Sequence, residues 1–327
     1  MASYLVTGGC GFIGTHLVRS LLADGHRVAV LDDLSTGRRA ALDPRAALIL
    51  GDVASPGDLI AAADGADGVF HLAAIASVPR CLADPARSRA VNAEGTRNAL
   101  AAARRVDGRA VPVVFASSAA VYGDAGRAPA AEARLPSPIS PYGVDKLAGE
   151  RHAAAAAARD GTRAIALRFF NVYGPGQDPS SPYSGVISIF ADRLGGGRAV
   201  PVHGDGGQLR DFVFVADVVA HLRAAMARAA ATPGGGFEIF NVCTGRAVSL
   251  RGLLATLCGL TGRRAAIEHL PPRPGDIRAS LGDPGAAVAA LGVRARTALG
   301  DGLAALLAAR PGNSLDSGRG RVESAHP

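Results

Sequence analysis

The chain has almost no lysine and no tryptophan. Of its 35 cationic side chains, 34 are arginine, and Lys146 is the one lysine among 327 residues. Arginine therefore serves wherever any positive charge suffices. A compact ammonium differs from a planar guanidinium in shape, hydration and readiness to lose a proton. Lys146 is thus predicted to occupy a position where arginine cannot substitute.

Cysteine is scarce as well. Cys10, Cys81, Cys243 and Cys258 are widely separated, with no CxxC pair and no histidine cluster at metal-ligand spacing. We therefore expect reduced thiols and no metal site.

The sequence contains no apolar run near the roughly 20 residues that a membrane span needs. The first residues show no basic segment followed by an apolar run and a cleavage site, so we expect a cytoplasmic location and no membrane partner. The net charge is +7. The arginines alternate with acids, however, and no basic run is interspersed with aromatics, so no nucleic-acid partner is expected.

The pattern of apolar segments predicts an α/β protein with a Rossmann-like, doubly wound parallel sheet. Short apolar runs of β type alternate with helical stretches, and such alternation places helices on both faces of a parallel sheet. The expected strands are at 4–6, 28–31, 47–50, 68–71, 111–116 and 163–168, and the expected helices lie near 12–24, 56–63, 84–107 and 141–160.

A Gly- and Pro-rich segment at 173–182 indicates a loop that enters a smaller, mixed α/β lobe. A strand and helix around 211–230 and a strand at 237–242 are expected to return to the large sheet. The resulting domains are a Rossmann domain (1–172 plus about 211–245), a smaller lobe of short helices and one strand (about 173–210 and 246–310), and a disordered tail (311–327).

A glycine pattern follows the first expected strand. Residues 8–14 (GGCGFIG) satisfy both GxxGxxG and, from Gly9, GxGxxG. Glycines permit a tight turn and let the backbone approach a pyrophosphate at the helix N-terminus, where free N–H groups attract anions. The second expected strand ends in Asp32, whose carboxylate would bind the adenine ribose and repel a 2′-phosphate. The segment predicts NAD, while the nearby Arg38 and Arg39 keep NADP open.

A second group of polar residues lies where the fifth expected strand ends. Ser117 and Ser118 fall at the carboxyl edge of the sheet, where open α/β folds place their ligands. Farther along, Tyr142 and Lys146 share one face of a helix that begins at Pro141. Tyrosine ordinarily has a pKa of about 10, so an adjacent ammonium and a positive nicotinamide are needed to favour the phenolate. The pattern predicts a redox site with Tyr142 as acid/base.

Seven motifs carry a family resemblance that covers residues 3 to about 310. They are 7–14 (TGGCGFIG), 31–37 (LDDLSTG), 51–53 (GDV), 71–74 (HLAA), 142–146 (YGVDK), 168–175 (RFFNVYGP) and 204–211 (GDGGQLRD). With them the chain resembles the extended short-chain dehydrogenase/reductase family, in its NAD-dependent sugar-nucleotide epimerase/dehydratase branch. The resemblance implies that the Rossmann domain holds NAD and that the smaller lobe binds a nucleoside diphosphate sugar.

The resemblance also implies roles for individual residues. The implied catalytic residues are Ser118, Tyr142 and Lys146. The implied NAD contacts are Gly8, Gly11, Phe12, Ile13, Gly14, Asp32, Asp33, Ser35, Thr36, Gly37, Asp52, Val53, Leu72, Ala73, Ala74, Asn92, Ser117, Tyr142 and Lys146. The implied contacts of the UDP-sugar substrate are Ser77 and Arg80 at the sugar, Arg210 and Arg273 at the diphosphate, Asp276 at the nucleotide ribose, and Ser118, Asn171, Gly185, Val186, Val202 and Ser280.

Two alanines help to choose the reaction. The family's 4,6-dehydratases carry an acid after the hydroxyl residue that aligns with Ser118, whereas this chain has Ala119 and Ala120. We therefore expect NAD-dependent inversion at C4 of a UDP-hexose (UDP-glucose/UDP-galactose), by transient oxidation to a 4-keto sugar and hydride return. Ser280 stands where epimerases restricted to glucose and galactose have a bulky tyrosine, which favours tolerance of N-acetylhexosamines. Arg80 leaves UDP-glucuronate as an alternative.

Other interpretations stay open. A dehydratase or a 4-keto-sugar reductase of the same family is an alternative, although a reductase would take NADPH from solution, which Asp32 argues against. A non-catalytic NAD-binding protein is a further alternative, but such relatives commonly lack the tyrosine or the lysine. Family members usually dimerise through the helices that match 84–107 and 141–160, so a homodimer is expected.

Overall fold

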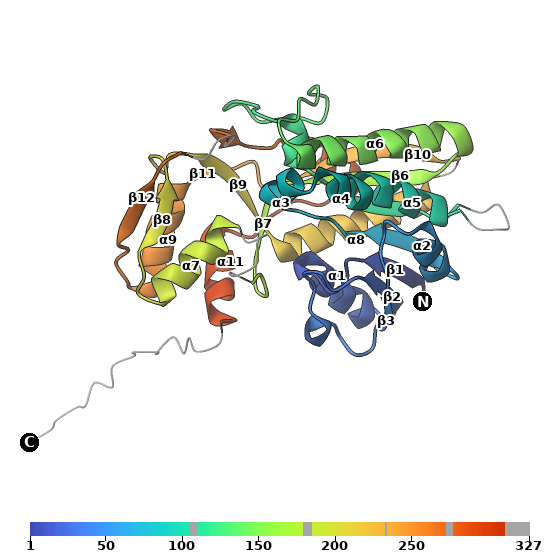
Figure 1. Cartoon of the computed structure of the whole chain (residues 1–327), viewed down its shortest axis with the longest axis horizontal. Helices are drawn as coiled ribbons and strands as arrows, with labels where there is room; N and C mark the ends of the chain where they lie inside the picture. Colours follow the sequence, from blue (N-terminus) through green and yellow to red (C-terminus); the bar gives the residue numbers. More distant parts are fainter. Residues whose placement is uncertain (105–109, 179–184, 233, 273–276, 311–327) are drawn as a thin grey trace, which may run out of the picture.

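The computed structural model describes residues 1–104, 110–178, 185–232, 234–272 and 277–310. Its main feature is a parallel sheet of seven strands in the order β10-β6-β5-β4-β1-β2-β3 (Figure 1). The strands are β1 (Ser3–Thr7), β2 (Arg27–Asp32), β3 (Ala47–Leu50), β4 (Gly68–His71), β5 (Val113–Ser118), β6 (Arg163–Phe169) and β10 (Gly236–Val242). The expected doubly wound α/β fold is confirmed.

Helices cover both faces of this sheet, and each face has its own apolar core. On one face, Leu17 and Leu21 of α1 and Leu222 of α8 pack with Val30 and Leu167. On the other face, Leu59 of α2 and Ala153 of α6 pack with Leu31 and Phe115. The helices are α1 (Phe12–Ala23) and α8 (Val215–Ala231) on the first face, and α2 (Pro56–Ala63), α5 (Gly95–Ala102) and α6 (Pro141–Asp160) on the second.

The expected helix at 84–107 is interrupted. It consists of α4 (Pro85–Arg89), a π-helical turn (Ala90–Glu94) and α5, with the short α3 (Val78–Ala83) ahead of it. Residues 105–109 lie outside the described part of the chain. The fifth strand begins at Val113 rather than 111, and Pro112, which has no N–H for a ladder hydrogen bond, directly precedes it.

The smaller lobe has more strands than the one expected, and it lies to the left of the large sheet in Figure 1. One sheet joins β11 (Ala247–Ser249), β9 (Leu209–Phe214) and β13 (Ala279–Ser280), and β7 (Asn171–Tyr173) also pairs with β9. The strands β8 (Val200–His203) and β12 (Ile267–Leu270) form another sheet. The helices of this lobe are α7 (Val186–Gly195), α9 (Leu250–Thr261) and α11 (Leu299–Ala308). The helix α10 (Gly285–Leu291) packs instead with α8 and β10 of the large sheet.

One expectation about connectivity is wrong. The strand near 211 was expected in the large sheet, but β9 pairs with β7, β11 and β13 instead. Only α8 and β10 return, with β10 pairing along β6. The chain leaves the large sheet after β6 and enters β7, and β9 pairs along β7. The carboxylate of Asp211 in β9 accepts hydrogen bonds from the backbone N–H groups of Thr244 and Gly245 just after β10, which ties the two sheets together. The predicted tail, 311–327, lies outside the described residues.

Core packing predicts a clear contrast between two leucines. Leu167 in β6 is fully buried, whereas Leu135 is 86% exposed. Leu167→Ala should lower the free energy of unfolding by about 2–5 kcal/mol, because a cavity remains in a dense core. Leu135→Ala should change it by no more than about 0.5 kcal/mol. Urea denaturation of both variants measures the difference, and equal effects would contradict this assignment of the core.

Candidate active site

Two cavities adjoin at the carboxyl edge of the large sheet. The larger, of about 440 Å³, lies between the sheet and the smaller lobe, and the smaller, of about 150 Å³, lies over the ends of β2 and β3. They share the lining residues Gly8, Gly11, Thr36, Leu72 and Ala74. The strand order reverses between β1 and β4, and open α/β sheets bind their ligands at such a switch point.

The glycine turn between β1 and α1 forms a floor of backbone under both cavities. Gly8 has φ +69°, and a Cβ on it would lie 2.7 Å from the amide nitrogen of Ala73. A Cβ on Gly14 would lie 2.2 Å from the carbonyl oxygen of Gly8. Side chains are therefore excluded where the turn meets α1, which leaves the backbone open to an anionic ligand at the helix N-terminus.

Asp32 at the end of β2 is held rigidly. Its Oδ2 accepts from the backbone N–H of Cys10 and its Oδ1 from that of Leu34, each at 2.9 Å. Burial raises the pKa of Asp32, against the opposing effect of these two hydrogen bonds. The carboxylate thus ties the glycine turn to β2 while it lines the smaller cavity.

An arginine that the sequence analysis missed closes the side of the smaller cavity. Arg87 of α4 forms ion pairs with Asp52 at 2.7 Å and with Asp33 at 3.6 Å. Its hydrogen bond to Asp52 is among the causes that lower the pKa of that carboxyl group, although burial opposes it. Arg87 is one of many arginines and stands outside the quoted motifs, so the sequence offered no signal for it.

The helix α6 presents Tyr142 and Lys146 to the larger cavity. It begins sharply because Ser140 Oγ accepts from the N–H of Gly143 at 3.2 Å and Pro141 occupies the first turn. Lys146 Nζ donates to the carbonyl oxygen of Ala116 at 2.8 Å and lies 5.9 Å from the centroid of the Tyr142 ring. The predicted pairing of the single lysine with Tyr142 is therefore present in the structure.

Burial shifts the titration of both groups. It raises the pKa of Tyr142 to about 12, while a hydrogen bond with Ser118 acts in the opposite direction. It lowers the pKa of Lys146 to about 8, opposed by Cys81 and Asp145. Lys146 therefore remains largely cationic at pH 7, and it can help to stabilise a phenolate that burial alone disfavours.

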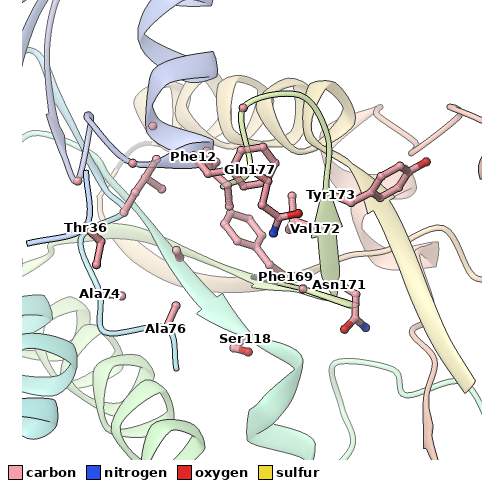
Figure 2. A pocket seen from close by; sticks show the side chains of 18 of the residues that line it. Phe12, Thr36, Ala74, Ala76, Ser118, Phe169, Asn171, Val172, Tyr173 and Gln177 are labelled. Carbon is pink, nitrogen blue, oxygen red and sulfur yellow. The ribbon is translucent and has the colours of Figure 1, made fainter. Parts of the chain in front are cut away.

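Ser118 completes the group at the end of β5, and Figure 2 shows its side chain to the lower left of Asn171 among the lining residues. Nearby, His71 at the end of β4 is buried, with Nδ1 2.8 Å from Thr7 Oγ1. Burial, reinforced by Lys146, lowers the pKa of His71 to about 3. This histidine is therefore neutral and adds no second positive charge next to the lysine.

Most of the predicted contacts line a cavity. Those along the larger one are Gly8, Gly11, Phe12, Ile13, Gly14, Thr36, Leu72, Ala74, Ser117, Ser118, Tyr142, Lys146, Asn171, Gly185 and Val186. The smaller one adds Asp32, Asp33, Ser35, Gly37, Asp52, Val53 and Ala73. Residues from eight segments of the sequence are thereby brought together at one edge of the sheet.

Arg80 and Ser77 do not line the larger cavity, and Asn92 lines neither cavity, so their predicted roles stay predictions. Arg80 was expected at the sugar but lines the smaller cavity, on the side of Arg87. Ser77 is buried and caps α3 by accepting from the N–H of Arg80. Asn92 is fully buried behind the wall, where its side-chain oxygen accepts from the N–H of Ile75 at 2.8 Å.

Three other predicted substrate contacts in the smaller lobe, Val202, Arg210 and Ser280, are not part of either cavity lining. Val202 is buried in the apolar core of the lobe. Ser280 is also buried and pairs with Arg210 between β13 and β9, so its role in admitting an N-acetyl group stays a prediction. Arg273 and Asp276 lie outside the described residues.

The loop that leaves β7 supplies cavity residues that the sequence analysis missed. Gln177 and Asp178 line the larger cavity, together with Phe169 at the end of β6; Figure 2 shows Gln177 beside Phe12. The loop is fastened where the carbonyl of Pro175 lies 2.8 Å from His16 Nε2. Phe169 lies within the motif 168–175, so the sequence offered a signal for it. Gln177 and Asp178 lie in an irregular loop after the motif, and the sequence offered no signal for them.

The site combines three features: a backbone turn that can hold an anion, a buried acid at the end of β2, and a tyrosine with a lysine beside it. Together they define a redox site that works with a bound dinucleotide. The chain belongs to the NAD dependent epimerase/dehydratase family, whose sequence profile matches residues 4–243. This confirms the resemblance inferred from the motifs.

Named relatives cover nearly the whole chain. The UDP-glucose 4-epimerase of Mycolicibacterium smegmatis is 39% identical over 308 residues, which are 92% of this chain and 96% of that protein. The crystal structure of UDP-glucose 4-epimerase from Thermotoga maritima with UDP-glucose is 34% identical, with a TM-score of 0.87, and covers 94% of this chain and 98% of that one. MoeE5 in complex with UDP-glucuronic acid and NAD is 39% identical, with a TM-score of 0.81, over 93% and 97% of the two chains.

The two hydrogen bonds to Asp32 lead to a prediction about the cofactor. Asp32→Asn turns one acceptor into a donor that faces a backbone N–H and removes the charge that repels a 2′-phosphate. We expect NAD affinity to fall by about 10-fold or more, because a hydrogen bond to a charged group contributes about 1.5–3 kcal/mol. The ratio of the affinity for NAD to the affinity for NADP should also decrease.

Calorimetric titration of the two dinucleotides measures this effect. Asp43→Asn is the matched control, because Asp43 bonds Arg45 outside both cavity linings. An unchanged NAD affinity in Asp32→Asn would contradict the assigned role.

Proposed function

We propose that this protein catalyses NAD-dependent inversion at C4 of a UDP-hexose. The observation that carries the proposal is the cluster of Tyr142, Lys146 and Ser118 on one wall of the larger cavity. The relatives support it, since those from Mycolicibacterium smegmatis and Thermotoga maritima are UDP-glucose 4-epimerases. The predicted domain division fits the same proposal, with the large sheet holding NAD and the smaller lobe binding the UDP-sugar.

The residues present suit NAD. The turn at Gly8 and Gly14 excludes a Cβ, as close backbone contact with a pyrophosphate requires. Asp32 and Asp52 line the smaller cavity and would meet the adenosine portion. In this proposal the two adjoining cavities would receive the two halves of a dinucleotide. NAD, when bound, supplies the hydride acceptor and donor for the reaction.

The side chains of this chain account for the proton transfer. Tyr142 would accept the proton of the sugar O4 as a phenolate and return it as a phenol. Ser118 would hold the O4 oxygen, and its hydrogen bond with Tyr142 already favours the phenolate. Lys146, buried against the carbonyl of Ala116, supplies the positive charge that offsets the burial of the tyrosine.

The segment after Ser118 argues against dehydration. Ala119 and Ala120 begin a 3₁₀ turn, Ala119–Tyr122, where the family's dehydratases carry an acid. Elimination of water needs a group that takes one proton and gives another, and neither alanine can do this. The proposal is therefore an epimerase that returns its hydride to the same sugar.

The expected homodimer and cytoplasmic location stay predictions. Val144 on α6 is 46% exposed and Leu82 on α3 is 60% exposed, so apolar side chains are available near the expected dimer helices. Within the described ranges, no helix combines the length and the apolarity that membrane crossing requires.

A panel of nucleotide sugars tests the proposed reaction. Incubation with UDP-glucose, UDP-galactose, their N-acetylated forms and UDP-glucuronate, followed by chromatography, should reveal a C4 epimer of at least one UDP-hexose. Tyr142→Phe should lower kcat by about 10²- to 10⁴-fold, the usual contribution of general acid/base catalysis. Tyr4→Phe is a control because Tyr4 lines neither cavity. No epimer from any sugar, or full activity in Tyr142→Phe, would refute the proposal.

The electrostatic role of Lys146 predicts a change in pH dependence. In Lys146→Met the phenolate loses its nearby cation, so its pKa rises. The acid limb of the kcat/KM profile should then move to higher pH by about one unit, equivalent to about 1.4 kcal/mol. Lys146→Arg should also stay well below wild-type activity, because a guanidinium is larger and differently shaped. An unmoved acid limb in Lys146→Met would show that the charge does not tune Tyr142.

A further inference from the structure

Three residues of α6, spaced four apart, contact three consecutive residues at the end of β5. Tyr142 bonds Ser118, Lys146 Nζ donates to the carbonyl of Ala116, and Glu150 Oε1 accepts from Ser117 Oγ at 2.6 Å. The first two pairs belong to the proposed chemistry. The third pair, Glu150 with Ser117, lies one helical turn farther along the same face, beyond the proposed catalytic group.

Glu150 is itself held by an arginine from the neighbouring strand. Arg168 of β6 donates from Nε to Glu150 Oε1 at 2.9 Å and from Nη2 to Oε2 at 2.7 Å. The two side chains are only 2% and 3% exposed. The Arg168 guanidinium also lies 4.7 Å from the centroid of the Tyr122 ring, which restrains it from the other side.

Such an arrangement is poorly explained by stability alone. Removing two charges from water is costly, and a buried ion pair replaced by apolar side chains of similar volume often leaves stability unchanged or higher. The pair does fix geometry, because a carboxylate that receives two parallel N–H bonds from a planar guanidinium has a single orientation. Its oxygen facing Ser117 therefore has a defined position relative to β5.

We propose that Glu150 and Arg168 are positioning residues that set the register of α6 against the end of β5, and so hold Tyr142 opposite Ser118. The pair acts through the hydroxyl of Ser117 and contacts no reacting atom. This inference rests on the proposed function for its kinetic consequence, whereas its structural consequence does not depend on the substrate.

Paired substitutions avoid the misfolding expected of single ones. Removing only Glu150 or only Arg168 would leave a buried charge without its partner. The informative proteins are therefore Ser117→Ala, the double variant Glu150→Leu with Arg168→Met, and the triple variant that combines them. Ser117→Ala is the single substitution that leaves the ion pair intact, because it removes only the hydroxyl that donates to Glu150 Oε1.

Kinetics give the first measurement. The double variant should lose about 10- to 100-fold in kcat, with KM within about threefold of wild type, because a small misplacement of a catalytic group can cost this much. Ser117→Ala should show a loss of similar size. The triple variant should be no slower than the double variant, because the changes interrupt one connection and are not additive. The melting temperature of the double variant should stay within about 3 °C of wild type.

Hydrogen exchange gives a measurement independent of the sugar. In wild-type protein that retains its cofactor, amides at 116–118 and at the first turns of α6 should exchange slowly, and they should exchange about 10-fold faster in both the double variant and Ser117→Ala. If the wild-type protein epimerises no UDP-hexose, the proposed function is refuted. The hydrogen-exchange prediction can still be confirmed or refuted independently.

A second ion pair in the chain provides the matched control. Arg228 binds both oxygens of Glu238 at 2.7 and 2.8 Å, but the pair is about one-third exposed and, among the described residues, has no hydrogen bond to a serine. Arg228→Met with Glu238→Leu should leave kcat and exchange at 116–118 unchanged. The inference is overturned if the Glu150/Arg168 double variant keeps full kcat, or if its kcat, KM and melting temperature all worsen together. It is overturned as well if the loss of kcat in the triple variant equals the product of the losses in the double variant and in Ser117→Ala. It is also overturned if Ser117→Ala leaves kcat and the exchange rates at wild-type values.

Discussion

The burial of the Lys146 ammonium against the end of β5 is the interaction on which the rest of the site depends. Its Nζ donates to the carbonyl of Ala116, in the middle of the sheet, where β5 lies between β4 and β6. This contact fixes one face of α6 against the strand, so Tyr142, one turn earlier on the same face, lies next to Ser118. The same burial lowers the pKa of the lysine to about 8, so its charge at neutral pH is retained but readily altered.

The cavity above this contact exists because the chain leaves one sheet and immediately enters another. The strand β6 ends at Phe169, and β7 begins at Asn171 as part of the smaller sheet through its pairing with β9. Phe169 and Asn171 therefore line the cavity from the point where the two lobes meet. The buried Asp211 anchors β9 in turn, because its carboxylate accepts a hydrogen bond from the N–H of Thr244 just after β10.

The sequence was informative where the chemistry is local. The glycine turn, Asp32 at the end of β2, and the Tyr142–Lys146 spacing each depend on neighbours within one strand, turn or helix, and the structure places all of them at the cavities. Arg87 was missed because its partners Asp33 and Asp52 come from other strand ends. For the same reason β9 was assigned to the wrong sheet, since an apolar run indicates a strand but not which strand it pairs with.

The contrast between the two buried cations explains why one lysine persists in an arginine-rich chain. Arg168 cannot lose its proton in a protein, so its burial requires a full countercharge, which Glu150 provides in a two-point pair. Lys146 is buried as deeply, yet its hydrogen-bond acceptor is a neutral carbonyl. If a carboxylate accepted the hydrogen bond from Lys146, it would neutralise the positive charge that favours the Tyr142 phenolate. An arginine at position 146 would need such a carboxylate as its countercharge. Only a small cation that tolerates incomplete compensation leaves its charge available to the tyrosine.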